Sequence, residues 1–249
     1  MIEFCHVTAG YGGVPAVRDV SLHIPRGKIT AVIGPNGCGK TTLLRAAVRQ
    51  LPLSGGEILM DGRSVSDYGR KEFARAASFM PQVRTVPSIT VGGLVAHGRF
   101  PHLGLSRQLR QADRAAVERA MEETGVSAWA GRDLRELSGG ERQRVYLAMA
   151  LAQETEVIFL DEPTTYLDLG RQFEVLGLIR TLNSRGKTIV MVLHDLAQAL
   201  GYSHQTVLLE QGRLVLCAGA ETLYESGEID RVFGVRACRA GETWYFTPR

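Results

Sequence analysis

Short continuous apolar runs alternate along this chain with longer stretches in which apolar residues recur at helical spacing. Three such runs cover residues 29–33, 157–160 and 188–193, and their length and continuity are typical of strands buried on both faces. Between the second and third runs, apolar residues recur every three positions from Phe173 to Leu182, which predicts a helix. Strands that alternate with helices indicate a largely parallel sheet with right-handed crossovers.

The N-terminal part of the chain shows a second pattern, in which apolar and polar residues alternate one by one. Residues 20–24, closed by the turn residues 25–27, and residues 56–62 are expected to form antiparallel strands. Between them, apolar residues return to helical spacing from Leu43 to Leu51, directly after a glycine-rich loop. The local order is therefore strand, loop, helix.

The C-terminal part is expected to contain a short helix after His194 and then a hairpin. The hairpin is formed by residues 207–209 and 214–216 about a turn at residues 211–212. Residues 231–249 follow no clear periodicity. They contain three aromatic residues that are expected to pack rather than to act: Trp244, Tyr245 and Phe246.

A stretch rich in helix-forming residues lies between the glycine-rich loop and Leu137, most clearly over residues 110–124. It is interrupted by residues 92–93 and by the loop-like residues 98–104. We therefore expect a helical sub-lobe of about residues 83–155 inserted in the sheet domain. No internal repeat or low-complexity linker divides the sequence, so residues 1–249 are expected to form one domain.

The composition is that expected of a soluble globular protein. Hydrophobic residues make up 45% of the 249 residues and charged residues 22%. No window approaches the run of about 20 apolar residues that a membrane-spanning helix needs, so a membrane pore would come from another chain. The net charge of +3 is small and arginine is scattered, which argues against a nucleic-acid partner. The four cysteines show no CxxC spacing, which favours a reducing cytosol.

The glycine-rich loop matches the pattern GxxxxGK[ST], in which glycines let backbone N–H groups turn toward phosphate oxygens. Lys40 is expected to reach the β and γ phosphates, and the Thr41 hydroxyl to ligate Mg²⁺. A coincidental glycine-rich turn is the alternative, but the flanking strand and helix favour the phosphate loop. Cys38 places a thiol inside the loop, where alkylation would affect the site. The expected nucleotide contacts are Gly34, Pro35, Asn36, Gly37, Cys38, Gly39, Lys40, Thr41 and Thr42.

Two adjacent carboxylates, Asp161 and Glu162, end the second buried run. Such residues emerge at the carboxyl edge of the sheet, where nucleotide sites form. Asp161 suits Mg²⁺ through a water, and Glu162 suits the orientation or deprotonation of the attacking water. Taken alone, a strand that ends in Asp-Glu is more often a solvated strand end. The phosphate loop upstream reverses that preference.

The segment Leu137–Glu141 reads LSGGE and precedes a helix in which Val145, Met149 and Ala152 share one face. A capping box of the Ser138 and Glu141 side chains is a purely structural explanation for these two residues. The paired glycines, Gly139 and Gly140, exceed what a cap needs and let backbone amides approach an anion closely. The segment resembles the signature motif of ABC ATPases, which implies a contact with the γ-phosphate held by a second subunit.

With these three motifs the resemblance extends over essentially the whole chain. Tyr11 resembles the aromatic residue that stacks on adenine, although a tyrosine beside glycines is more often packed in a turn. Gln82 resembles the glutamine that senses Mg²⁺ and the water, although an isolated glutamine is usually a surface residue. Asp168 resembles a residue of the loop that crosses the dimer interface and also fits a plain helix N-cap. His194 resembles the switch histidine that bonds the γ-phosphate, although a lone histidine at a strand end is more often structural.

Residues 97–104 and 164–172 are similar to segments of the cassettes that import iron-siderophores, haem and cobalamin. The first lies where those cassettes receive the coupling helix of the permease. His97 and His102 fit no standard metal-ligand spacing. Another ABC importer or an exporter shares the main motifs and remains an alternative. A non-transport ABC ATPase is disfavoured because the sequence has neither tandem cassettes nor a long coiled-coil insertion, and a non-hydrolysing regulatory subunit because Lys40, Glu162 and His194 are all present.

The resemblance implies an α/β fold, namely the mixed-sheet core of a P-loop NTPase (RecA-like) with an antiparallel β sub-lobe and an inserted helical sub-lobe. It implies ATP and Mg²⁺ as ligands and a head-to-tail pair of copies that closes over two ATP molecules. The other implied partners are integral membrane permease subunits and, indirectly, a substrate-binding protein. The chain is then expected on the cytoplasmic face of the inner membrane, as a peripheral protein.

Overall fold

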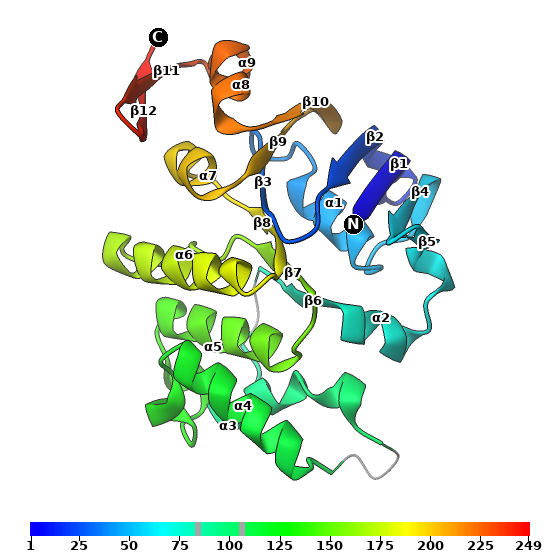
Figure 1. The fold of residues 1–249 in the computed structure, drawn as a ribbon, viewed down its shortest axis with the longest axis vertical. Helices are drawn as coiled ribbons and strands as arrows, with labels where there is room; N and C mark the ends of the chain where they lie inside the picture. Colours follow the sequence, from blue (N-terminus) through cyan, green and yellow to red (C-terminus); the bar gives the residue numbers. More distant parts are fainter. Residues whose placement is uncertain (83–85, 105–107) are drawn as a thin grey trace. The chain divides into compact units, whose positions relative to one another are not determined.

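The computed structural model describes residues 1–82, 86–104 and 108–249 (Figure 1). The chain divides into two compact units. Unit 1 comprises Met1–Tyr68 and Thr188–Arg249, and unit 2 comprises Gly69–Lys187. Of the helical sub-lobe predicted over about residues 83–155, residues 83–85 and 105–107 lie outside the described part of the chain.

Unit 1 contains an antiparallel sheet whose strands are drawn in blue and cyan in Figure 1. The strands are β1 (Ile2–Tyr11), β2 (Val14–Ile24), β4 (Leu53–Met60) and β5 (Arg63–Ser64), in the spatial order β2-β1-β4-β5. The alternation predicted over residues 20–24 is confirmed, because Val20, Leu22 and Ile24 are buried while the residues between them are exposed. The run predicted over 56–62 lies in β4, which begins earlier than expected, at Leu53, and ends at Met60. The last two residues of the predicted run, Asp61 and Gly62, have positive φ and form the turn into β5.

A mixed sheet forms the other part of unit 1. Strand β3 (Ile29–Ile33) is parallel to both β8 (Thr188–Val192) and β9 (Gln205–Glu210), and β10 (Arg213–Ala218) is antiparallel to β9. Every residue of β3 and β8 is buried, as the continuous apolar runs predict. The predicted hairpin is confirmed as β9 and β10, which are joined by a tight turn at Gln211 and Gly212 with φ of 48° and 82°.

The helices of unit 1 begin with α1 (Lys40–Ala47). The apolar spacing predicts this helix as far as Leu51, but it ends earlier because Arg49 has a φ of 60°, which a right-handed helix does not admit. The short helix expected after His194 is α7 (Leu196–Tyr202). The remaining helices are η1 (Val65–Asp67), α8 (Ala220–Glu225) and α9 (Glu228–Phe233).

The end of the chain forms a hairpin of β11 (Val235–Ala240) and β12 (Thr243–Pro248). Trp244 is buried, and its ring lies 5.3 Å from that of Tyr224, between centroids. The expectation that Trp244 packs is therefore confirmed. The same expectation is wrong for Tyr245, which is exposed because successive residues of a strand point to opposite faces.

Unit 2 combines a pair of parallel strands with most of the longer helices. Strand β6 (Ala77–Met80) pairs with β7 (Val157–Asp161), whose residues are all buried. The helix predicted over 110–124 is α4, and the helix predicted from Phe173 starts earlier, at Leu169. The helices of unit 2 are α2 (Arg70–Ala76), α3 (Val91–His97), η2 (Phe100–His102), α4 (Gln111–Glu123), η3 (Ser127–Trp129), η4 (Leu134–Glu136), α5 (Gly139–Ala152) and α6 (Leu169–Ser184).

One interruption predicted in this region is wrong. Gly92 and Gly93 lie inside α3, near its start, and do not break it. The Thr90 hydroxyl caps the helix by accepting a hydrogen bond from the N–H of Gly93 at 3.2 Å, which offsets the poor helix propensity of glycine. Within the described ranges, no helix combines the length and the apolar character that crossing a membrane would require.

Candidate nucleotide-binding site

The residues predicted to bind nucleotide are divided between the two units. Those in unit 1 are Tyr11, the loop from Gly34 to Thr42, and His194. Those in unit 2 are Gln82, Ser138, Gly139, Gly140, Asp161, Glu162 and Asp168.

The loop from Gly34 to Thr42 connects β3 directly to α1, so the predicted strand-loop-helix order is present. Inside the loop, the N–H of Cys38 donates to the carbonyl oxygen of Pro35 at 3.2 Å and closes a turn. Helix α1 begins at Lys40, and the first N–H groups of any helix have no acceptor within it. Together with the positive end of the helix dipole, this is the arrangement that binds phosphate groups.

Gly39, the residue before α1, can only be glycine here. Its φ is 102°, which side-chain-bearing residues rarely adopt. A Cβ at this position would lie 2.5 Å from the carbonyl oxygen of Ala16 in β2. Both the backbone angle and the close approach to β2 therefore explain the second glycine of the motif.

The Lys40 side chain is buried, with 6% of its surface exposed, and lies across its own loop. Its Nζ donates to the carbonyl oxygens of Gly34 at 2.7 Å and Pro35 at 3.1 Å. Burial raises the pKa of the neighbouring Cys38 thiol, and the charge of Lys40 lowers it by a smaller amount. The thiol therefore stays protonated near neutral pH, which reduces its reactivity toward alkylating reagents.

Two further predicted residues of unit 1 lie at strand ends. Tyr11 ends β1 with 49% of its surface exposed, and its hydroxyl accepts a hydrogen bond from Arg45 Nη1 at 3.3 Å. His194 is exposed and follows β8, which is parallel to β3 with Val192 opposite Val32. Since parallel strands end at the same sheet edge, His194 and the start of the phosphate loop lie at one edge of the sheet.

In unit 2 the structure brings Gln82 and Glu162 together. Strands β6 and β7 are parallel, with Met80 opposite Leu160, and each of the two residues lies two positions beyond that pair. Gln82 Nε2 donates to Glu162 Oε2 at 2.8 Å, and the Thr165 hydroxyl donates to the same oxygen at 3.1 Å. The carboxylate of Glu162 is thus held by two donors in one orientation.

The backbone of Glu162 is also unusual, because its φ of 57° lies in the left-handed region. Such a conformation costs about 1–3 kcal/mol for a residue other than glycine and persists only where surrounding contacts enforce it. One such contact comes from Gln143 in α5, whose Nε2 donates to the carbonyl oxygen of Glu162 at 2.8 Å. Sequence reasoning missed Gln143. It lies in the polar run from Glu141 to Arg144, so no local pattern distinguishes it from its neighbours.

The residues Ser138, Gly139 and Gly140 lie at the start of α5 and border an open hollow of about 490 Å³. The predicted capping box is confirmed: Ser138 N–H donates to Glu141 Oε2 at 2.7 Å, and Glu141 N–H donates to Ser138 Oγ at 3.3 Å. The bond from the Ser138 N–H lowers the pKa of Glu141. Arg144 and Arg171 also line this hollow, together with the acidic Glu141 and Asp168, so groups of both charges lie beside the helix start.

Asp168 borders the same hollow and caps α6. Its Oδ1 accepts a hydrogen bond from the N–H of Arg171 at 2.9 Å, which confirms the N-cap interpretation of this residue. A role for Asp168 at a dimer interface stays a prediction.

The residues predicted to ligate Mg²⁺ supply oxygen atoms of the kind this ion prefers. They are the Thr41 hydroxyl, the amide oxygen of Gln82 and the carboxylate of Asp161, which is fully buried at the end of β7. In the part of the chain that is described, no three His, Cys, Asp or Glu side chains gather into a cage. This donor set fits Mg²⁺, which is commonly held by one or two protein oxygens together with substrate phosphates.

Comparisons with known proteins agree with this arrangement. The family model described as ABC transporter matches residues 17–165. The iron(3+)-hydroxamate import ATP-binding protein FhuC of Bacillus subtilis (strain 168) is 43% identical over 230 residues, which cover 92% of this chain and 86% of FhuC. The ferric enterobactin transport ATP-binding protein FepC of Escherichia coli (strain K12) is 42% identical over 232 residues, with coverage of 92% and 86%.

Among solved structures, the dimeric structure of MJ0796, a bacterial ABC transporter cassette, matches with a TM-score of 0.79 and 27% identity. The match covers 88% of this chain and 99% of that one. The predicted fold class, a mixed-sheet α/β core of the P-loop NTPase type with an antiparallel sheet and added helices, is thereby confirmed.

Proposed function

The chain belongs to the ABC transporter family, and from that membership we propose that it powers the import of a ferric siderophore or a similar metal chelate through a separate permease. It is an ATPase that serves transport. The observation that carries the choice of cargo is the likeness to FhuC and FepC, each covering 92% of this chain. The names of both relatives refer to ferric chelates, which favours a ferric siderophore over haem or cobalamin.

We assign the hydrolytic step to the residues predicted to bind nucleotide. Glu162 orients the attacking water, and Gln82 and Thr165 hold its carboxylate in place. Lys40 and His194 offset the negative charge that develops on the γ-phosphate, and Tyr11 offers its exposed ring to the adenine. Mg²⁺, held by Thr41, Asp161 and Gln82, would supply further charge neutralisation when bound.

We also propose that two copies close head to tail over two ATP molecules. The hollow beside Ser138 and Gly139 is open, has backbone N–H groups at a helix start and has Arg144 in its wall. These features suit the γ-phosphate of an ATP molecule bound to the loop of a second copy. Asp168, which borders the same hollow, would then lie at the interface between the copies.

The remaining partners in this proposal are two permease subunits, on whose cytoplasmic side the dimer sits as a peripheral protein. A substrate-binding protein on the other side of the membrane delivers the chelate. ATP-driven closure and hydrolysis-driven reopening then switch the permease between two states, since binding energy shifts a two-state equilibrium.

The test is to purify the tagged chain with whatever membrane protein binds it and to reconstitute the complex in lipid vesicles. We expect ATP-dependent uptake of a ferric hydroxamate or ferric catecholate, measured with radioactive iron, and no uptake of cobalamin or haem. Uptake of cobalamin or of haem, without uptake of either ferric chelate, would overturn the choice of a ferric siderophore as the cargo. If no membrane protein co-purifies and ribosomes stimulate the ATPase activity instead, the transport function is wrong.

A further inference from the structure

Unit 2 contains a buried pair of opposite charges that the nucleotide site does not use. Among the described residues, the buried charged side chains outside the predicted nucleotide site are Arg99 and Asp113. A buried ion pair is weak evidence for stability, because desolvation offsets most of the attraction between the charges. A buried ion pair does hold the segments that carry it in one arrangement, because each buried charge must keep its hydrogen-bond partners. The position of Arg99 therefore calls for an explanation beyond stability.

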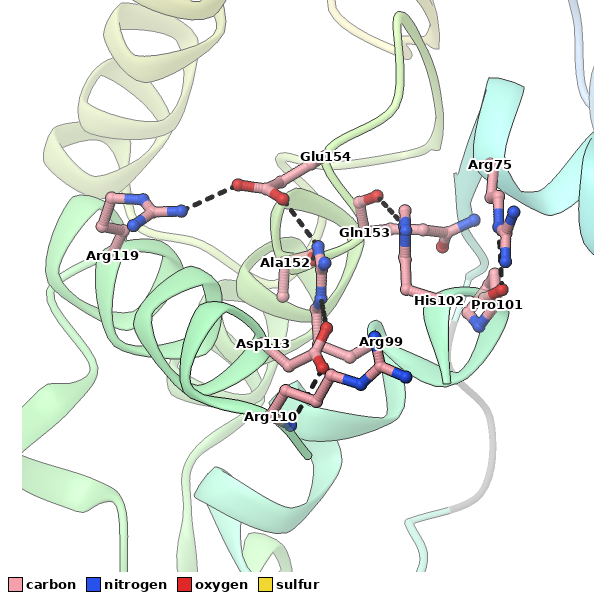
Figure 2. Close-up of polar contacts among 10 residues, drawn as sticks. All are labelled: Arg75, Arg99, Pro101, His102, Arg110, Asp113, Arg119, Ala152, Gln153 and Glu154. Carbon is pink, nitrogen blue, oxygen red and sulfur yellow. Dashed lines mark hydrogen bonds and ion pairs between the residues drawn. The ribbon is translucent and has the colours of Figure 1, made fainter. Parts of the chain in front are cut away.

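Arg99 joins three segments of unit 2 through one guanidinium group, as Figure 2 shows. Its Nε donates to Asp113 Oδ1 in α4 at 3.0 Å. Its Nη1 donates to the carbonyl oxygen of Ala152 at 2.8 Å and to Glu154 Oε2 at 2.7 Å. Ala152 is the last residue of α5, so Arg99 supplies a donor to one of the carbonyl groups that a helix end leaves without a partner.

The neighbours of Arg99 attach the same segment to the same helix end. His102 Nε2 donates to the carbonyl oxygen of Gln153 at 2.9 Å, as also drawn in Figure 2. Gly98 lies so close to α5 that a Cβ would be 2.3 Å from the carbonyl oxygen of Met149. Gly98, Arg99 and His102 therefore each contact the last turn of α5 or the two residues that follow it.

The other side of this segment is held by α2 and leaves one aromatic ring exposed. Arg75 Nε in α2 donates to the carbonyl oxygen of Pro101 at 3.0 Å. Phe100 is 54% exposed, and its ring lies 4.4 Å from that of His97, between centroids. The segment thus presents an apolar surface outward while its inner side is fixed to α5 and α2.

The opposite end of α5 carries the nucleotide-facing residues. Ser138 caps its start beside the hollow, and Gln143 in its second turn bonds the carbonyl oxygen of Glu162. A helix of this length is a rigid connection between its two ends. A displacement of residues 98–102 therefore reaches Ser138 through the contacts of that segment with the end of α5, among which those of Arg99 are the buried, charged ones.

We propose that Arg99 is a positioning residue that couples the exposed surface at Phe100 to the Ser138 end of α5. This inference rests on the proposed function for two points: a permease as the protein that binds over Phe100, and the ATP of a second copy at the Ser138 end. The coupling is reciprocal, because linkage requires each site to affect the other equally. ATP bound at the Ser138 end must therefore change the behaviour of residues 98–102 even without a permease.

The experiment uses the full chain with Glu162→Gln and follows amide hydrogen exchange of residues 98–104 by mass spectrometry, with and without Mg·ATP. We expect ATP to slow this exchange by about fivefold or more, the lower end of typical coupling factors. Adding Arg99→Met should remove most of that slowing while ATP binding persists. Arg99→Lys retains the positive charge but not the planar guanidinium group with its several donors. It should therefore show part of the ATP-induced slowing of exchange.

The matched control is Arg119→Met, which removes an exposed partner of the same Glu154 carboxylate and leaves Arg99 in place. It should leave the ATP effect unchanged. Equal ATP-induced slowing in the Arg99→Met variant would overturn the proposal, as would no slowing in the Glu162→Gln parent. If Arg99→Met fails to fold, Arg99→Lys and Asp113→Asn decide the question. The proposal is overturned if ATP slows the exchange of residues 98–104 in both of these variants as much as in the Glu162→Gln parent. ATP binding and dimer formation, measured on the same samples, report separately on the proposed function.

Discussion

The side-chain amide of Gln143 donates to the backbone carbonyl of Glu162 across 2.8 Å, and both residues are buried. Gln143 lies in α5, the helix that Ser138 caps, whereas Glu162 follows strand β7. Ser138 is predicted to contact the γ-phosphate of one ATP molecule, and Glu162 is predicted to orient the water that attacks a different one. The bond therefore connects structural elements that serve two nucleotides. Since Glu162 has a left-handed backbone conformation, this contact also contributes to holding an unfavourable geometry.

Replacing Gln143 tests that connection. In Gln143→Leu the carbonyl oxygen of Glu162 loses the Gln143 donor and keeps the N–H of Thr165 at 3.3 Å. The loss of one such hydrogen bond costs about 0.5–1.5 kcal/mol of stability. We expect kcat for ATP hydrolysis to fall about tenfold or more, because a small misplacement of a catalytic group is costly. KM should change little. Steady-state kinetics and urea unfolding measure both effects, with the exposed Gln111→Leu as the control. An unchanged kcat would show that the bond does not position Glu162.

Removal of the Lys40 ammonium tests the phosphate loop. Lys40→Ala takes away a charged donor, and a hydrogen bond to a charged group is worth about 1.5–3 kcal/mol. We therefore expect ATP to bind about tenfold to a hundredfold more weakly. Equilibrium titration with a fluorescent ATP analogue measures the change, and Lys28→Ala at an exposed site is the control. Equal affinity in the two variants would mean that Lys40 does not contact the phosphates.

Acidity should destabilise unit 2 through Asp113. Burial raises the pKa of this carboxyl, but the Arg110 N–H and the Arg99 guanidinium outweigh it, so the pKa is lower in the folded state. A lowered folded-state pKa gives stability that is present above the unfolded value of about 3.9 and is lost as pH falls through the folded value.

The measurement is the urea midpoint at pH 5 and at pH 3. The midpoint should fall between these pH values by more in the parent than in Asp113→Asn, which has no carboxyl to protonate. The exposed Asp67→Asn should behave like the parent. An equal fall in the parent and in Asp113→Asn would mean that Asp113 contributes nothing to the acid sensitivity.

The sequence is sufficient to predict the parts of the site that depend on neighbouring residues. The strand-loop-helix order around Lys40, the capping box of Ser138 and the hairpin about Gly212 each follow from short local patterns, and the structure contains all three. Local helix limits are less predictable. Arg49 ends α1 early through a positive φ, and Thr90 lets α3 include two glycines.

Contacts between distant segments could not be predicted in this way. Arg99 bonds the carbonyl of Ala152, which lies 53 positions further along the chain, and Gln82 bonds Glu162 at a separation of 80. In the sequence, Arg99 is one of many scattered arginines and gives no sign of burial. Its partners depend on how α3, α4 and α5 pack, which no local pattern specifies.

The most direct test of the account is the Glu162→Gln variant, because it addresses both hydrolysis and pairing of copies. The amide has the shape of the carboxylate but cannot accept a proton from water, and loss of a general base typically costs about a hundredfold or more. We expect ATP affinity close to that of the unaltered chain and almost no phosphate release. With Mg·ATP the variant should sediment as a dimer, and without nucleotide as a monomer. Phosphate release at the unaltered rate, or a monomer at saturating ATP, would contradict the account.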